Sequence, residues 1–175
     1  MSLIRFEAKL SKIGSWIILK LHKSASTSLP SRGMVMVDGT INGVAFQAPL
    51  EPDGQGSHWF KVDKSMLKAA HADTGDTVKV EIEPTKVWPE PEVPEDLKKA
   101  LQMNKEAYKT WMDITPIARW DWIRWINSTK NPETRKIRIE KTFSKFKDGI
   151  RRPCCFNRTM CTVPDVSHNG VLLEF

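Results

Sequence analysis

The chain has 175 residues, of which 40% are hydrophobic and seven are tryptophan, and its formal net charge is +6. This composition predicts a folded protein with a hydrophobic core, and the length is sufficient for one large domain or two small ones. No apolar run approaches the ~20 residues of a transmembrane helix, and the N-terminus lacks the features of a signal peptide. The three cysteines, an odd number, are unlike a secreted disulfide framework, so we expect a cytoplasmic protein without membrane insertion.

The positive charge is unevenly spread along the chain. Residues 1–86 have a net charge of +2, residues 87–97 of −4 and residues 98–152 of +9. The basic character therefore belongs to the third of these stretches. Such an asymmetry favours anionic partners without identifying one.

Residues 1–86 are typical of a small β domain. Short apolar runs predict strands at residues 6–10, 16–21, 34–41, 44–48, 57–62 and 77–83. Asn42-Gly43 predicts a two-residue type I′ hairpin, because both residues tolerate positive φ. Asp63 is a suitable N-cap for a short helix over residues 64–70, and the serine-rich residues 24–32 indicate an exposed loop. These elements predict a small closed or nearly closed β-barrel.

A proline-rich stretch, residues 87–97, separates this barrel from the rest of the chain. Its prolines lack an N–H and have a fixed φ, so neither a central strand nor a helix interior continues through them. They are Pro89, Pro91 and Pro94. We therefore expect an extended strap at 87–97, a helical segment at 98–152 and a cysteine-containing tail at 153–175.

Three helices are expected after the strap. The first follows Pro94, with an interruption near Asn104 left open, and the others begin at Thr115-Pro116 and Asn131-Pro132. Aromatic residues recur on them at helical spacing, which predicts packing on one another and on the barrel. We expect four of these to be largely buried: Trp111, Trp125, Phe143 and Phe146. The predicted fold class is α+β, a small β-barrel followed by a three-helix appendage packed on it.

These residues together resemble a bacterial family of two joined parts. The first part is similar to an uncharacterised small β-barrel domain, in Phe6, Gly39-Thr-Ile-Asn-Gly43 and Gly75-Asp76-Thr-Val78 among others. The second is similar to the YdeI/OmpD-associated segment, whose members are also labelled bacteriocin-protection proteins. Its shared residues include Val93-Pro94, Trp125-Ile126, Lys130, Glu133-Thr134-Arg135 and Arg138-Ile139.

This resemblance covers about residues 4–150 and implies a specific barrel. The barrel would be of the double-split, or swapped-hairpin, type, similar to that of AbrB-type transition-state regulators. The resemblance implies no catalytic residue. The chain departs from the family pattern at Lys20-Leu21-His22, where a proline would be expected, and the tail lies outside the similarity.

The candidate ligand site is an anion-binding corner at the start of the third helix. Arg135 and Arg138 offer guanidinium donors, Lys130 and Glu133 lie beside them, and a helix N-terminus has free N–H groups. The alternative is a capped helix whose arginines pair with acids of the barrel or strap. His58, on a strand after a glycine-rich turn, is either a structural hydrogen-bonding residue or a pocket wall.

Nothing in the sequence predicts a cofactor or a catalytic residue. Cys154, Cys155, Cys161 and His168 have zinc-binding side chains, but their spacing matches no usual zinc pattern. We predict no metal, and favour structural cysteines over a redox-sensitive thiol. The motifs GxSxG, HExxH and GxxxxGK[ST] are absent from the sequence.

Three functional hypotheses follow. The first is a non-enzymatic cytoplasmic protein, with a binding, stress or bacteriocin-protection role, that uses a groove between barrel and helices for an anionic ligand or a protein partner. The second is nucleic-acid binding through the basic helical half. The third is an enzyme acting on a small anionic substrate, with His58 as acid or base near Arg135. The sequence does not indicate an oligomeric state.

Overall fold

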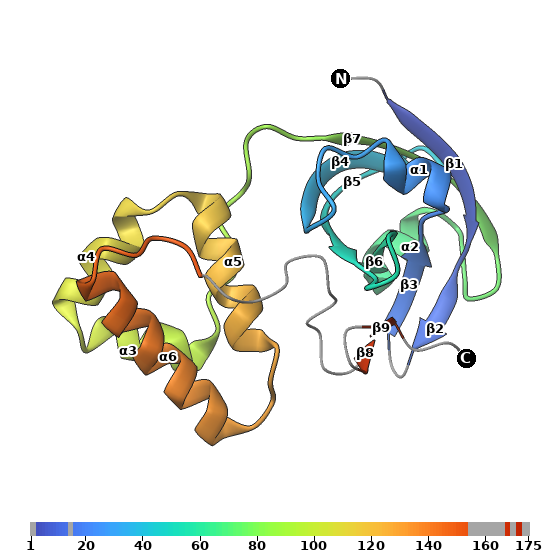
Figure 1. Ribbon diagram of the computed structural model, residues 1–175. Coiled ribbons are helices and arrows are strands. Elements are labelled where there is room, and N and C mark those ends of the chain that lie inside the picture. Colours follow the sequence, from blue (N-terminus) through green and yellow to red (C-terminus); the bar gives the residue numbers. More distant parts are fainter. Residues whose placement is uncertain (1–2, 14–15, 154–166, 169–170, 173–175) are drawn as a thin grey trace. The chain divides into compact units, whose positions relative to one another are not determined.

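The computed structural model describes residues 3–13, 16–153, 167–168 and 171–172 (Figure 1). The chain divides after Lys86 into a β unit and a helical unit, which we describe separately. The predicted α+β class is confirmed, because the strands belong to the first unit and four successive helices to the second. No helix within the described ranges is long and apolar enough to cross a membrane.

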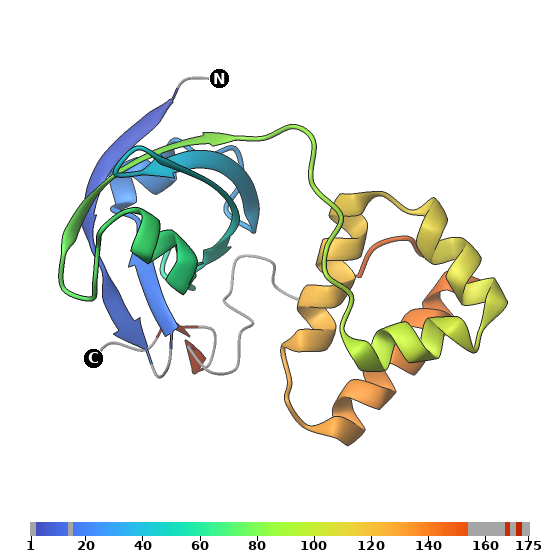
Figure 2. The ribbon, with the colours of Figure 1, turned by 180° about the vertical axis from the view of Figure 1, so that it is seen from behind.

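The β unit is built on a seven-stranded antiparallel sheet that curls into a half-barrel (Figures 1 and 2). Its strand order is β1-β7-β4-β5-β6-β3-β2. The strands are β1 (Ile4–Lys9), β2 (Ser11–Ile13), β3 (Trp16–Lys20), β4 (Val35–Ile41), β5 (Val44–Pro52), β6 (His58–Val62) and β7 (Thr77–Pro84). Two further short strands, β8 (Ser167–His168) and β9 (Val171–Leu172), pair with each other.

The hairpin predicted at Asn42-Gly43 is confirmed. Asn42 has φ 48° and Gly43 has φ 83°, and β4 pairs with β5 from Ile41 opposite Val44 onward. The side-chain oxygen of Asn42 also accepts a hydrogen bond from the backbone N–H of Lys79, at 2.9 Å. This side chain therefore anchors the turn to the neighbouring strand β7, a role beyond the tolerance of positive φ.

The helix predicted after Asp63 is also confirmed, as α2 (Lys64–Ala69). The Asp63 carboxylate accepts from the backbone N–H of Met66 at 2.8 Å, and this bond is the first cause of the lowered pKa of Asp63. The loop predicted at residues 24–32 is wrong in part, because α1 (Lys23–Thr27) covers its first residues. Ala25 and Ser26 are buried on this single turn, and such small side chains give no hydrophobic period.

Gly39 in β4 is required by the close approach of β7. A Cβ at this position would lie 2.1 Å from the carbonyl oxygen of Glu81 and 3.0 Å from the Ile82 side chain. We expect Gly39→Ala to lower the free energy of unfolding by about 1–3 kcal/mol, because the paired strands must separate to admit the methyl group. Urea denaturation measures this loss. The neighbouring change Thr40→Ala is the control and should cost less, and an unchanged midpoint for Gly39→Ala would contradict the prediction.

The described residues of the helical unit form four helices, not the predicted three. They are α3 (Glu95–Gln102), α4 (Lys105–Asp113), α5 (Pro116–Asn127) and α6 (Pro132–Lys147). The first expected helix is interrupted at Asn104, whose side chain accepts from the backbone N–H of Ala107 at 3.0 Å and so begins a new helix. The starts predicted at Thr115 and Asn131 are confirmed as side-chain N-caps.

The core of the helical unit is aromatic and centres on Trp122. This side chain is 0% exposed. The distance between ring centres is 5.4 Å from Trp122 to Phe146 and 6.0 Å from Trp122 to Trp125. Trp111 and Phe146 are buried as predicted, whereas Trp125 and Phe143 are only partly buried at the edge of the core. The packing of these helices on the barrel stays a prediction.

Candidate functional site

The arginines of the helical unit join helix ends to neighbouring segments. Arg119 on α5 is 7% exposed, and its Nη1 donates to the carbonyl oxygens of Trp111, at 2.8 Å, and Ile114, at 2.6 Å. These carbonyls end α4 and have no partner within that helix. The Nε and Nη2 atoms of Arg119 donate to the two carboxylate oxygens of Glu90. One buried guanidinium thus holds the end of α4 against the strap.

Arg135 on α6 has the same role at a different junction. Its Nε and Nη2 atoms donate to the Asp96 carboxylate at 2.8 and 3.1 Å, and its Nη1 donates to three oxygens at the C-terminal end of α5. Those acceptors are Ile126 O, Asn127 Oδ1 and Thr129 O, at 3.2, 3.0 and 3.3 Å. Every nitrogen of this guanidinium therefore has an acceptor within the protein.

Arg138 lies one turn after Arg135 and completes the cap of α5. Its Nη1 donates to the Trp125 carbonyl at 2.7 Å and to the Ser128 hydroxyl, and the guanidinium carbon lies 5.5 Å from the centre of a Trp125 ring. Burial, followed by the positive charge of Arg135, lowers the pKa of Arg138. Both candidate arginines are thus engaged by the protein itself.

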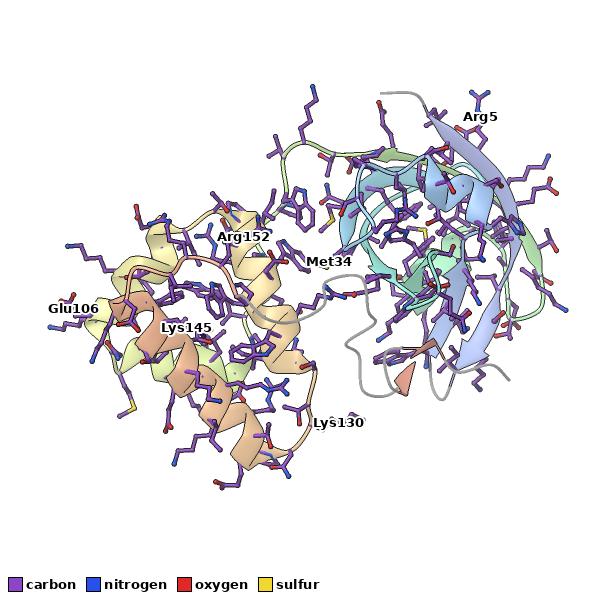
Figure 3. All side chains as sticks on the ribbon, in the orientation of Figure 1. Arg5, Met34, Glu106, Lys130, Lys145 and Arg152 are labelled. Atoms are coloured by element: carbon purple, nitrogen blue, oxygen red, sulfur yellow. The ribbon has the colours of Figure 1, made fainter. Side chains whose placement is uncertain are left out.

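The remaining residues of the predicted corner lie at the start of α6. Glu133 is exposed in the first turn, and Lys130 is exposed in the segment between α5 and α6 (Figure 3). The backbone N–H groups of Glu133 and Thr134 donate to the Asn131 side chain, which occupies donors that an anion would need. The structure thus brings four of the five candidates together at the start of α6, where Arg135 pairs with Asp96 and Arg138 binds a carbonyl and a hydroxyl at the end of α5.

His58, the fifth candidate, is a buried residue of β6 in the other unit. Its Nε2 lies 2.7 Å from the Gly33 carbonyl, which can only accept, so Nε2 carries the proton. Its Nδ1 lies 2.7 Å from the Ser26 hydroxyl, which also accepts from Arg32 at 3.1 Å. Both ring nitrogens are engaged, as expected of a structural histidine, and neither is left to move a substrate proton.

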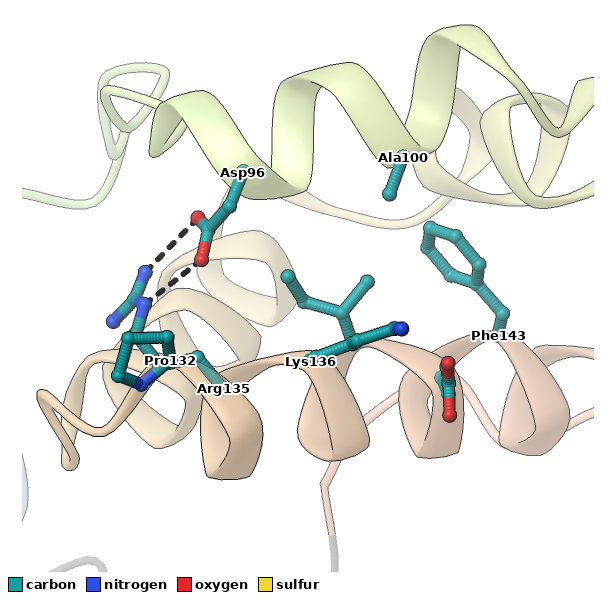
Figure 4. Close-up of a pocket in the computed structure, with 8 residues that line it drawn as sticks. Asp96, Ala100, Pro132, Arg135, Lys136 and Phe143 are labelled. Atoms are coloured by element: carbon teal, nitrogen blue, oxygen red, sulfur yellow. Dashed lines mark hydrogen bonds and ion pairs between the residues drawn. The ribbon is translucent and has the colours of Figure 1, made fainter.

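A cleft opens beside the Arg135–Asp96 pair, between α3 and α6 (Figure 4). It has a volume of about 540 Å³, and the ion pair closes one end of it. Its walls are largely apolar, because Ile139 and Phe143 of α6 line it, and the small side chain of Ala100 on α3 leaves the space between the helices. The complete lining is Asp96, Ala100, Pro132, Arg135, Lys136, Ile139, Glu140 and Phe143. The sequence did not predict this cleft. The feature that could have indicated it is a small residue, Ala100, on the face of α3 that lies opposite Ile139 and Phe143 of α6.

The Asp96–Arg135 pair makes the stability of the helical unit depend on pH. The hydrogen bond from Arg135 is the first cause of the lowered pKa of Asp96. A carboxyl group whose pKa is lower when folded stabilises the protein above its unfolded pKa, about 3.9, and this contribution is lost as pH falls through the folded value.

We expect Asp96→Asn to lower the free energy of unfolding at neutral pH by about 0.5–1 kcal/mol, a small value because the Asp96 side chain is 43% exposed. The difference from the unmodified protein should shrink at an acidic pH below the lowered pKa of Asp96, because the protonated carboxyl is then uncharged like the asparagine amide. Denaturant unfolding at both pH values measures it. Glu95→Gln is the matched control, since no partner of Glu95 occurs among the described residues. A difference that persisted in acid would contradict the pairing.

The side chains of the four residues that could bind zinc lie outside what the structure describes. Cys154, Cys155 and Cys161 lie outside the described residues, and so does the side chain of His168. Among the described residues, no group of three or more His, Cys, Asp or Glu side chains could hold a metal ion. That the cysteines have a structural role, rather than a redox-sensitive one, stays a prediction.

The fold and its openings define a two-part α+β protein, with a curled β domain and a helical domain that contains a ligand-sized cleft. Comparison with known families identifies both parts. Residues 90–149 match the OmdA family, described as bacteriocin-protection, YdeI or OmpD-associated, and residues 3–82 match a domain of unknown function, DUF1905. The chain therefore carries a DUF1905 domain followed by an OmdA domain, which confirms the resemblance noted in the sequence. No curated protein matches the chain.

Proposed function

We propose that the protein is a non-enzymatic binding protein whose OmdA domain binds a small amphipathic ligand in the α3–α6 cleft. The apolar walls of this solvent-open cleft, with Lys136 at the rim, are the observation that carries the proposal. Burial of an apolar group against Ile139 and Phe143 would provide most of the affinity. The ammonium of Lys136 would attract an anionic group, while Glu140 opposes it one turn later.

This role fits the family description, which names bacteriocin protection and no reaction. The structure supports the choice, because His58 and both candidate arginines have internal partners and are not presented to a substrate. The groove between barrel and helices, which the sequence suggested as the working surface, stays a separate proposal.

Nucleic-acid binding is less well supported than ligand binding. Arg119, Arg135 and Arg138 donate to acids and carbonyls of their own domain, so phosphate contacts would depend on exposed lysines. Any such binding would weaken steeply with salt. A gel shift with mixed DNA and RNA at low salt tests it, and a shift at micromolar protein would favour this function over ours.

The swapped-hairpin barrel also belongs among the proposals. It is supported by the strand order, in which β5 pairs with β4 along its first part and with β6 near its end, at Glu51 and Pro52. One long strand shared by two halves of a sheet is the arrangement that such a barrel needs. A likeness of this kind would concern the fold alone and would not transfer a DNA-binding function.

The amphipathic dye 1-anilinonaphthalene-8-sulfonate is a suitable probe of the cleft, because it combines an aromatic body with one negative charge. We expect it to bind the native protein with a fluorescence increase. Ala100→Phe fills the cleft and should weaken binding roughly tenfold, which corresponds to about 1.4 kcal/mol. Lys136→Ala should weaken it less, and Glu140→Gln should strengthen it.

Lys147→Ala, on the same helix but outside the cleft, is the matched control and should leave dye binding unchanged. Circular dichroism of each variant excludes unfolding as the cause of a change. Equal affinity of the Ala100→Phe variant and the unmodified protein would overturn the assignment of the cleft as the binding site.

A further inference from the structure

A second opening of the helical domain lies between the strap and helices α3 and α4, apart from the α3–α6 cleft. Its volume is about 860 Å³. Val93 of the strap, Leu101 of α3 and Trp111 of α4 contribute apolar surface, and the latter two are buried. None of its lining residues belongs to the cleft discussed above. We call this opening the strap groove.

Large apolar side chains are exposed along the strap groove. Tyr108 and Met112 lie one turn apart on α4, and they are 50% and 58% exposed. Two such neighbours beside an opening that also has apolar walls form a contiguous exposed apolar patch, which is typical of an interaction surface rather than of a solvated helix face. An aromatic ring and a flexible thioether can also adapt to a partner that presents several apolar side chains.

The charges around the strap groove differ between its two sides. Glu92 and Glu95, on the strap and the first turn of α3, are exposed and have no partner among the described residues. Lys98 and Lys105 line the groove further along α3 and at the start of α4. A partner would therefore be matched best by basic side chains next to the strap and by an acidic group near Lys105.

The strap also limits the conformation of a partner. A peptide that paired with the strap as a β-strand would need the backbone N–H groups of the strap as hydrogen-bond donors. Pro89, Pro91 and Pro94 have none, so a regular ladder cannot form along this segment. A helix satisfies its own backbone and needs only side-chain contacts, which the groove supplies.

We propose that the strap groove binds an amphipathic helical segment of a partner protein, with apolar residues against Tyr108 and Met112 and basic residues against Glu92 and Glu95. The helix would lie between the strap and α4, and the lysines of the groove would set its direction. The strap groove shares no lining residue with the α3–α6 cleft, so an experiment that contradicts one proposal leaves the other unaffected.

Fluorescence anisotropy of a labelled helical peptide tests the proposal with the full-length protein. The probe is a short peptide of leucine and lysine in amphipathic spacing. We expect the double variant Tyr108→Ala/Met112→Ala to weaken binding by at least about tenfold, since both changes remove exposed contact surface without opening the core. The double variant Glu92→Gln/Glu95→Gln should weaken it at low salt and much less at high salt.

Matched controls separate a specific surface from general attraction. Met103→Ala removes an 88% exposed side chain outside the groove, and Ala100→Phe fills only the α3–α6 cleft; neither should change peptide binding. A peptide of the same composition in scrambled order, and one with glutamate in place of lysine, should bind at least about tenfold more weakly. The proposal is overturned if either control peptide binds equally well, or if the Tyr108→Ala/Met112→Ala variant keeps full affinity.

Discussion

Replacement of Arg119 by methionine is expected to lower the free energy of unfolding of the helical domain by about 3–5 kcal/mol. The side chain is almost fully buried and donates to two carbonyl oxygens at the end of α4, as well as to the carboxylate of Glu90. Methionine keeps much of the packing volume but donates no hydrogen bond. The carbonyls of Trp111 and Ile114 would then lose their side-chain donor in a buried site, at about 1–3 kcal/mol each.

Two further variants test which part of this contact matters. Glu90→Gln should cost much less, since the Glu90 side chain is 66% exposed and water can replace its partner. Arg119→Lys should fall between the two, because an ammonium keeps the charge but cannot reach both carbonyls and the carboxylate as a planar fork does. Denaturant unfolding followed by tryptophan fluorescence measures all three. A loss for Glu90→Gln equal to that for Arg119→Met would show that the ion pair, and not the helix cap, stabilises the domain.

Trp122→Ala is expected to have the largest effect among the aromatic residues of the helical domain, a loss of about 3–5 kcal/mol. The indole is completely buried, packs edge-to-face against Phe146 and donates from Nε1 to the carbonyl of Arg151 at 3.0 Å. Its removal would leave a cavity at the centre of the core and an unpartnered carbonyl. Thermal or urea unfolding of the purified variant measures the loss, if it folds at all.

Trp125→Ala is the matched comparison, because the same residue type is removed from the same helix. The sequence predicts that Trp125 is largely buried, and a loss of about 3–5 kcal/mol would follow from such burial. The structure places that ring at the edge of the core, where it contacts Trp122 and the guanidinium of Arg138, so we now expect a smaller loss. Trp122→Phe, which keeps an aromatic ring, should retain part of the stability and thereby show folding where the alanine variant fails. Equal losses for Trp122→Ala and Trp125→Ala would contradict the assigned centre of the core.

The sequence by itself determined the features that depend on a few adjacent residues. The Asn42-Gly43 turn and the caps at Asp63, Thr115 and Asn131 all formed as expected. In each of them, a side chain or a permissive backbone satisfies groups within three or four residues, so distant parts of the chain have little influence. Asn104 belongs to the same class; the interruption that the sequence left open there occurs, because its side chain accepts from the backbone N–H of Ala107 and begins a new helix.

Tertiary structure alone decided what the charged residues of the helical domain do. Arg135 and Asp96 are 39 positions apart, and Arg119 and Glu90 are 29 apart, so no local pattern pairs them. The same guanidinium groups fit an anion site or a helix cap equally well by residue type. The packing of α6 against α3, and of α5 against the strap, places acceptors around them.

The openings of the helical domain were decided in the same way. Ala100 and Phe143 line a cleft only because α3 and α6 face each other. Tyr108 lines a groove only because the strap lies beside α4. An apolar residue at helical spacing is equally compatible with a core and with an exposed surface. Spacing along one element gives the direction of a side chain, whereas the neighbouring elements determine whether that side chain is covered.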